Sequence, residues 1–547
     1  MPKVDEKDIG IAIKKIRRER IMKNKFLQGT VILLITSVLL RGLGFVYQIL
    51  VVRYAGTESV GILNMGFPFY IILVVLATAG MPVAIAKLTA EYISRGREGQ
   101  ITIMMRTAFL LVGLLCFCCV VAALWVMPKL FQLFGTEQRV VRCFYMLIPG
   151  IVVVPFTSVM RGYFQGMQQM LYPSLGQMAE QLVRVVSGMI FILWLCPHDV
   201  VSLAMGLAAA AMVGELAGFL LLLFFYLYSR QKQKSEIVSL QNRGQVLQSL
   251  LALGLPTTFT RLTSSIDMAI EASLVPFCLM AVGYNASQAA GVYGQFSGVA
   301  ISLVTIPTVL TGALATALIP AVSEADATHQ KEALEQRCQQ SISITWLFSL
   351  PVILVLYVYG EQLGQILFQI HGLGAMMQIL SFGAVFMYLE QTIVGILQGL
   401  GRTRAVFVNN FFGSAAKLIG MYYCIRTLGW GSNGIAGGMV LGYGLQCFLN
   451  LTILARQVRL HLSWGEMLLP VGNSLLMLCI IQMIWNLLGG NIGISLLLAM
   501  IVAGCIYLIL LVPTGQIGQL TGKRTGKRQK ISNKRMSKKM SENNSIK

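Results

Sequence analysis

Residues 103–128 read IMMRTAFLLVGLLCFCCVVAALWVMP and carry a single charged side chain, Arg106. A helix needs about 20 apolar residues to cross a hydrocarbon core about 30 Å thick. Runs of this kind recur along the whole chain, which has 547 residues, is 56% hydrophobic and is only 12% charged. A backbone in lipid must satisfy its own hydrogen bonds, and no barrel-type alternating segments appear. The sequence therefore predicts an all-α, polytopic membrane protein.

The apolar runs predict about 14 transmembrane helices. In chain order they cover residues 26–53, 63–86, 103–128, 140–160, 171–195 and 200–228, then 247–281, 291–320, 340–360, 376–400, 404–425 and 434–455, and finally 465–489 and 492–513. Most of the 43 Lys and Arg residues lie in the N-terminal lead, the C-terminal tail and every second loop. This bias towards one side predicts that both termini are cytoplasmic.

The spans predict two six-helix lobes followed by two further helices. The predicted parts are a basic cytoplasmic lead (1–25), an N-lobe (26–228), a cytoplasmic linker (229–246), a C-lobe (247–455), two C-terminal helices (465–513) and a basic disordered tail (514–547). The net charge of +21 resides largely in the lead and tail. Anionic membrane lipids are therefore expected partners, and nucleic acid is not.

Internal similarity indicates that the two lobes are copies of one unit. RGYFQGMQQM begins at Arg161 and VGILQGLGRT begins at Val394, which pairs the Gln-Gly of each segment. YAGTESVG from Tyr54 resembles YNASQAAG from Tyr284 and pairs Gly61 with Gly291. The offsets lie between 220 and 233 residues, with six spans between equivalent points. Such a parallel repeat predicts a pseudo-two-fold axis along the membrane normal and alternating access by rocking lobes.

Nine ionisable side chains fall inside the predicted spans: Arg41, Glu180, Arg184, Glu215, Arg261, Asp267, Glu271, Glu390 and Lys417. Each costs about 2.5–3.5 kcal/mol to insert, so each is expected to face a partner or a cavity. Glu180 and Arg184 are spaced i, i+4 and can form an ion pair within the N-lobe.

The basic residues among them form a candidate substrate site. Repeat alignment pairs Arg41 with Arg261 and Arg184 with Lys417, and Arg binds pyrophosphate through a planar fork of donors. Asp267 and Glu271 are candidate ligands for a coupling cation, or partners of Arg261. The alternative is that all these charges form ion pairs that stabilise the lobes.

Several observations speak against an enzyme. No loop exceeds about 20 residues, a length that excludes a soluble catalytic domain. A P-loop and a D-x-D cluster are absent, and all four His residues lie in predicted loops. The eleven Cys residues mostly lie in apolar runs and are expected to pack there. We therefore expect no catalytic residues, no cofactor and no metal site.

Five segments resemble one family: TAGMPVAIAKLTAEY from Thr78, RGYFQG from Arg161, GVYGQ from Gly291, PTVLTGALATALIPAVSEA from Pro307 and ILQGLGRTR from Ile396. They are similar to the stage V sporulation protein B group of polysaccharide flippases, within the multidrug/oligosaccharidyl-lipid/polysaccharide exporter superfamily. The resemblance implies fourteen helices and a lipid-linked oligosaccharide substrate on undecaprenyl pyrophosphate, with the peptidoglycan precursor lipid II as the first candidate.

The resemblance also bears on individual residues. In the related lipid II flippases an R-x-L-G-F motif carries a cavity arginine, and RGLGF here puts Arg41 on it. Those proteins often carry a second arginine six residues on, where this chain has Tyr47. Their helices thirteen and fourteen form a groove for the lipid tail, which the resemblance implies for the last two spans here.

The sequence thus favours a flippase that carries a cell-wall precursor or polysaccharide unit across the bacterial cytoplasmic membrane, with cell-wall synthesis enzymes as candidate partners. Vegetative wall, spore cortex and another polysaccharide all stay open as destinations. The alternatives are a cation-coupled multidrug exporter of the same superfamily and a non-transporting membrane scaffold for wall synthesis.

Overall fold

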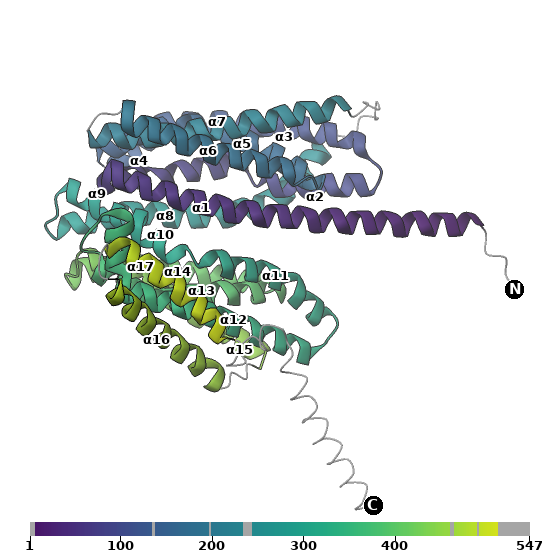
Figure 1. Cartoon of the computed structure of the whole chain (residues 1–547). Coiled ribbons are helices and arrows are strands. Elements are labelled where there is room, and N and C mark those ends of the chain that lie inside the picture. The colour runs from purple at the N-terminus through teal and green to yellow at the C-terminus, as the bar shows by residue number, and fades with distance from the viewer. Residues whose placement is uncertain are drawn as a thin grey trace, which may run out of the picture. The chain divides into compact units, whose positions relative to one another are not determined.

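The computed structural model describes residues 6–133, 137–195, 199–232, 243–459, 464–488 and 492–511, and these are almost entirely helical, with no strand among them (Figure 1). The all-α prediction is confirmed. The predicted tail and most of the predicted linker lie outside the described residues. Contacts divide the chain into two units, Met1–Val299 and Ala300–Lys547.

Unit 1 holds the first nine α-helices. They are α1 (Glu6–Thr78), α2 (Met81–Ser94), α3 (Glu98–Trp125), α4 (Met127–Leu133), α5 (Gln138–Gly166), α6 (Leu171–Ile190) with the π-helix η1 (Phe191–Leu195), α7 (Val200–Lys232), α8 (Arg243–Ala281) and α9 (Ala286–Gly294). The π-helix η2 (Gln295–Ala300) ends at the unit boundary. Helix α8 packs against α1 and α2. The lobes at 26–228 and 247–455 stay a prediction.

Helix α1 is a hairpin of two helices joined at one residue. Gly56 has non-helical backbone angles (φ 78°, ψ 163°), which only glycine adopts readily. From Gly44 to Tyr47 the first half follows α6 from 181 to 188, whereas from Gly66 to Tyr70 the second half follows α5 from 140 to 150. Because only residues 167–170 join α5 to α6, those helices run in opposite directions, and so do the two halves of α1.

The hairpin bears on the number of membrane crossings. Ten helices of the described residues are long and apolar enough to cross a membrane, and one of these candidates is Ile35–Ser94, with 60 residues. That candidate contains the Gly56 turn and two predicted spans, 26–53 and 63–86. Helix α6 carries Glu180 and Arg184 and is not among the ten. The chain is a multi-pass membrane protein, and the count of fourteen crossings stays a prediction.

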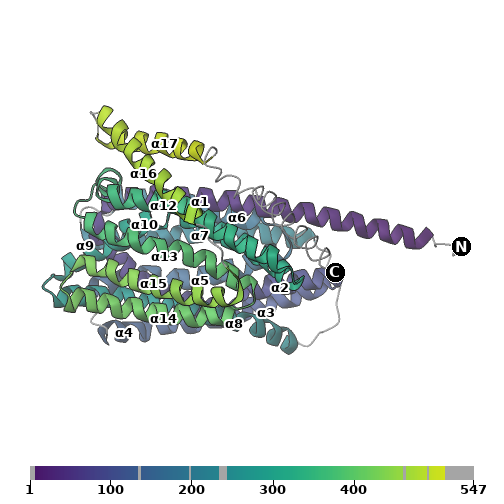
Figure 2. The same ribbon diagram turned by 90° about the horizontal axis from the view of Figure 1, so that it is seen from below.

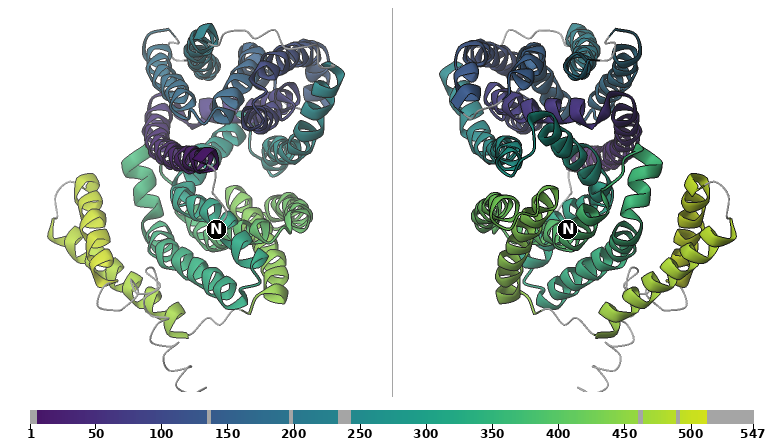
Figure 3. Two further views of the ribbon diagram at one scale, coloured as in Figure 1. Left: turned by 90° about the vertical axis from the view of Figure 1, so that its right-hand side faces the viewer. Right: turned by 90° about the vertical axis from the view of Figure 1, so that its left-hand side faces the viewer.

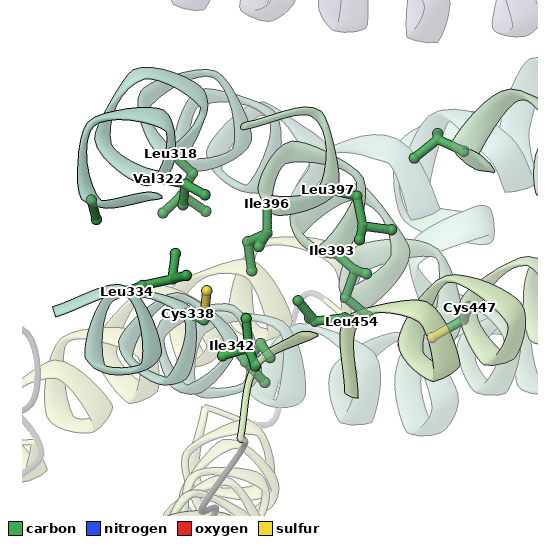
Figure 4. Close-up of a cluster of buried hydrophobic side chains, with 13 residues drawn as sticks. Leu318, Val322, Leu334, Cys338, Ile342, Ile393, Ile396, Leu397, Cys447 and Leu454 are labelled. Atoms are coloured by element: carbon green, nitrogen blue, oxygen red, sulfur yellow. The ribbon is translucent and has the colours of Figure 1, made fainter. Parts of the chain in front are cut away.

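Unit 2 contains the remaining helices (Figure 2). They are α10 (Ile301–Thr305), α11 (Thr308–Ala327), α12 (Lys331–Leu363) with η3 (Gly364–Phe368), α13 (Gly374–Gly399), α14 (Thr403–Tyr422) with η4 (Tyr423–Thr427), α15 (Ser432–Gln457), α16 (Trp464–Leu487) and α17 (Ile492–Leu510). Buried side chains of α11, α12, α13 and α15 form its core, including Val322, Cys338, Ile396 and Leu454 (Figure 4).

Helices α16 and α17, drawn in yellow-green and yellow in Figure 3, pack on α12. Tyr507 of α17 donates a hydrogen bond to the carbonyl of Leu347 (2.7 Å), and Tyr359 of α12 donates to Gln482 Oε1 (2.9 Å). Both hydroxyls thereby satisfy their hydrogen-bonding capacity inside an apolar contact.

The predicted repeat reappears in the backbone hydrogen bonds, at a constant offset of 233 residues. After α5 the turn is closed by Met167 N to Tyr163 O, Gln168 N to Gln165 O and Gln169 N to Phe164 O, and after α13 by Leu400 N to Ile396 O, Gly401 N to Gln398 O and Arg402 N to Leu397 O. After α2 the bonds are Arg95 N to Glu91 O, Gly96 N to Ile93 O and Arg97 N to Tyr92 O, and after α11 Thr328 N to Glu324 O, His329 N to Asp326 O and Gln330 N to Ala325 O.

One predicted pairing within the repeat is wrong by three residues. Gly61 has no room for a Cβ because of the carbonyl of Ala290, and Gly294 has none because of the carbonyl of Thr57. These two contacts are reciprocal only if Gly61 is equivalent to Gly294, not to Gly291. The tyrosines of YAGTESVG and YNASQAAG misled the alignment, because α9 begins at Ala286, a turn before Ala290.

Candidate functional site

Four charged side chains from three helices meet inside unit 1. Glu180 of α6 accepts from Arg161 Nη2 of α5 (2.7 Å) and from Arg184 Nη2 (2.8 Å), while Glu215 of α7 lies 3.4 Å from the same Arg184 nitrogen. All four are mostly buried, with side-chain exposures of 15–26%. Two acids and two bases cancel in charge, which lowers the cost of holding them in a membrane. The predicted Glu180–Arg184 pair is confirmed.

Glycine of a neighbouring helix positions the basic residue of each copy. A Cβ at Gly214 of α7 would lie 2.9 Å from Arg184 Cβ, and a Cβ at Gly442 of α15 would lie 2.5 Å from Lys417 Cβ. Helices α6 and α7, and likewise α14 and α15, therefore approach closely at the equivalent depth. The sequence pairing of Arg184 with Lys417 corresponds to the same local packing in both units.

The remaining predicted site residues lie on two helices of unit 1. Arg41 lies on α1 and is exposed, and Arg261 of α8 is exposed as well. Asp267 and Glu271 lie one turn apart on α8 and are partly buried. Helices α1 and α8 pack against one another. Lys417 belongs to unit 2.

Tyr47 occupies the position where a second cationic residue was considered. Its hydroxyl lies over Gly188 of α6, so that a Cβ at Gly188 would collide with it. This side chain fixes α1 against α6 and, being neutral, adds no positive charge there.

Unit 2 holds a second polar cluster that the sequence did not indicate. Asn409 of α14 donates to Asn450 Oδ1 (2.8 Å), and Asn450 of α15 donates to Glu390 Oε1 of α13 (3.4 Å). Asn450 is fully buried. Among the described residues no Lys or Arg lies within ion-pair distance of Glu390, and no three His, Cys, Asp or Glu side chains gather as metal ligands would.

Sequence reasoning also missed Arg161 as a partner of Glu180, because the fourth span was predicted to end at residue 160. In the structure α5 continues to Gly166. The i, i+19 spacing of Arg161 and Glu180 carries no helical signal, although both flank the YPS turn that reverses the chain.

Comparison with known families gives two matches. The polysaccharide biosynthesis protein family matches residues 26–326, which is more than half of the chain. The MatE family matches residues 297–423.

Curated relatives come from Bacillus subtilis. Stage V sporulation protein B is 27% identical over 447 residues, covering 81% of this chain and 86% of that protein. Lipid II flippase MurJ is 24% identical over 430 residues, covering 73% of this chain and 77% of that protein.

Solved structures with the same fold include a multidrug resistance MATE family transporter of the MOP superfamily in an inward-facing conformation, with a TM-score of 0.65 at 18% identity over 76% of this chain and 94% of that one. The lipid II flippase MurJ in an inward closed conformation has a TM-score of 0.64 at 16% identity, over 88% of this chain and 98% of that one. These similarities confirm the predicted superfamily and its transporter fold, and the relatives are flippases and transporters, not enzymes.

Proposed function

Because this chain belongs to the polysaccharide biosynthesis protein family, we propose that it is a flippase for an undecaprenyl-pyrophosphate-linked cell-wall precursor or polysaccharide unit, with lipid II as the first candidate. The substrate is expected to pass from the cytoplasmic to the outer leaflet by alternating access. The proposal draws on the flippases among its relatives. One structural observation carries it: each repeat copy places a basic residue, Arg184 or Lys417, at the same depth against a glycine of the next helix.

In this proposal Arg41, Arg261, Lys417 and Arg184 bind the pyrophosphate. Pyrophosphate suits arginine because its oxygens accept two parallel N–H bonds. Arg184 uses only Nη2 in its ion pairs, and in the described part of the chain its buried Nε has no hydrogen-bond partner. A donor is therefore left over after the internal charges are satisfied.

Asp267 and Glu271 would bind the coupling cation, since like charges one turn apart on α8 repel unless a cation lies between them. The polyprenyl tail would remain in lipid or along α16 and α17, which pack on the flank of α12.

We further propose that both termini are cytoplasmic, in the bacterial plasma membrane. Trp125 at the end of α3 and Trp194 in η1 are 74% and 84% exposed and lie at the ends of two helices that start from the predicted cytoplasmic side. The basic Arg95 and Arg97 precede α3 at its other end. Tryptophan at one end and arginine at the other is the pattern of interfacial anchoring and positive-inside orientation. Anionic lipids and cell-wall synthesis enzymes would be the partners on that side.

Depletion of the protein in a cell that relies on it for wall synthesis tests the function. Lipid II should become less accessible to an external probe, and expression of the wild-type chain should restore accessibility. Unchanged accessibility, with altered sensitivity to cationic drugs, would contradict the flippase proposal. An Arg41→Ala variant that restores accessibility fully would contradict only the assignment of that residue.

A second candidate is a cation-coupled multidrug exporter, and one observation favours it: the MatE match at residues 297–423. Such a protein needs an acidic cavity for cationic drugs. The two proposals therefore differ in the sign of the charge that binds substrate, and substitution of the basic residues separates them.

A further inference from the structure

One stretch of chain links the two units and is irregular where its repeat counterpart is regular. Residues 295–300 form the π-helix η2, residues 301–305 form the short helix α10, and α11 starts only after Pro307. The equivalent residues, 233 positions earlier, belong to the second half of α1, which is helical from 57 to 78. The boundary between the units falls within η2, at Val299 and Ala300.

The first half of this stretch is bound to α1, within unit 1. Gln48 Nε2 donates to the carbonyl of Gly298 (3.0 Å), and Asn64 Nδ2 donates to Ser297 Oγ (2.9 Å). Asn64 and Ser297 are equivalent residues under the offset of 233. A π-turn shifts carbonyls out of the regular i, i+4 pattern, and side-chain donors commonly satisfy such groups inside membranes.

The second half is bound to α13, within unit 2. Pro307 has no N–H for the carbonyl of Leu303, which instead accepts from Ile306 N (3.4 Å) in a tighter turn. The next carbonyl, that of Val304, accepts from the hydroxyl of Tyr388 (2.5 Å), which is completely buried. A side chain again supplies a donor where the backbone is irregular.

We propose that residues 295–307 are the hinge about which the two units move, with Gln48 and Asn64 anchoring it to unit 1 and Tyr388 anchoring it to unit 2. A π-turn followed by a proline break concentrates backbone freedom in α10, because both irregularities weaken the helical ladder on either side of it. The anchors keep the flanking backbone satisfied while the segment bends. This inference rests on the proposed function, since alternating access requires such a hinge.

Hydrogen–deuterium exchange of the full chain in lipid nanodiscs tests the hinge without any substrate. Backbone amides of 295–308 are expected to exchange at least ten times faster than those of the equivalent segment, residues 62–75. Tyr388→Phe should raise exchange a further several-fold around Val304, and Gln48→Leu should do so around Gly298. Pro307→Ala restores a backbone donor and should slow exchange across α10.

The matched control is Tyr359→Phe, which removes a hydroxyl bonded to Gln482 on α16 and should leave residues 295–308 unchanged. Equal protection of residues 295–308 and 62–75 overturns the hinge. Fast exchange that none of the anchor variants alters overturns the roles given to Gln48, Asn64 and Tyr388. A failure of the proposed function would appear instead as unchanged lipid II accessibility, with the exchange pattern intact.

Discussion

At the scale of residues, the two copies differ where a left-handed backbone is required. Gln168 (φ 58°) occupies the position that Gly401 (φ 71°) occupies in the second copy, and His329 (φ 52°) occupies the position of Gly96 (φ 68°). A residue with a Cβ pays about 1–2 kcal/mol for this conformation, whereas glycine does not. Each copy thus contains one strained turn and one relaxed turn, in alternate places.

This difference predicts opposite effects for exchanged residues. Gln168→Gly and His329→Gly should each raise the free energy of unfolding by about 1 kcal/mol, because they remove the strain at a positive φ. Gly401→Ala and Gly96→Ala should lower it by at least as much. Thermal unfolding in detergent, monitored by intrinsic fluorescence, measures all four. A loss of stability in both glycine variants would show that the Gln168 and His329 side chains contribute more than the strain costs.

The ion cluster of unit 1 predicts a ranking of carboxylates. Glu180 binds two arginines at 2.7 and 2.8 Å, whereas Glu215 lies 3.4 Å from one. Loss of one member of a largely buried pair leaves an uncompensated charge and costs about 3 kcal/mol. Glu180→Gln should approach that loss, and Glu215→Gln should cost clearly less. The shift in denaturation midpoint measures both, and equal shifts would contradict the geometry of the cluster.

Sequence reasoning located this cluster only in part. The Glu180–Arg184 pair follows from the i, i+4 rule, which needs no tertiary knowledge. Arg161 and Glu215 lie on other helices, and only the packing of α5 and α7 against α6 brings them to Glu180. The second polar cluster, around Asn450, was missed for the same reason. Neutral amides do not stand out in an apolar span, although charges do.

At the scale of elements, close helix packing depends on single glycines. Gly442 of α15 lies against Lys417 of α14, and a Cβ there would come within 2.5 Å of the lysine Cβ. Gly504 of α17 has nothing within 4 Å of a Cβ position. Both are helix-interior glycines, so their backbone entropies are similar, and they differ in what a methyl group would meet.

Gly442→Ala should therefore destabilise the protein by about 1–3 kcal/mol through overpacking. Gly504→Ala should stabilise it by about 0.5–1 kcal/mol, because alanine loses less backbone entropy in a helix. Calorimetry or a thermal-shift assay on purified protein measures the sign. A neutral Gly442→Ala would mean that α14 and α15 can separate at this depth without cost.

The repeat was readable in sequence where glycine and helix ends determine the local structure. RGYFQG and VGILQG end their helices in identical hydrogen-bonded turns, which is why they aligned at 233 residues. The Gly61 pairing failed because the chain reverses at a single residue, Gly56, in the first copy and through a longer turn before Asn285 in the second. Loop length changes register without altering the helices that pack, and no pattern within one helix reports it.

At the scale of the whole molecule, the reciprocal contact of α1 with α9 concerns the transport cycle. Gly61 and Gly294 lie against each other's segments, and the equivalent residues Asn64 and Ser297 share a hydrogen bond. Equivalent residues of two repeat copies can touch only beside the axis that relates the copies. If the proposed alternating access is correct, this contact must open once in each cycle.

A reversible cross-link tests that requirement. In a background without the native cysteines, Asn64→Cys combined with Ser297→Cys should form a disulfide, because the two side chains lie within 2.9 Å of one another. The oxidised variant should lose at least nine-tenths of lipid II accessibility in depleted cells, and a reductant should restore it. The control is Thr345→Cys with Thr392→Cys, whose hydroxyls lie 2.6 Å apart between α12 and α13 in the core of unit 2. Helices within one rigid unit do not separate during rocking, so this second cross-link should leave transport intact. Transport that survives the first cross-link would mean that α1 and α9 stay together throughout the cycle, and that the units exchange access by another movement.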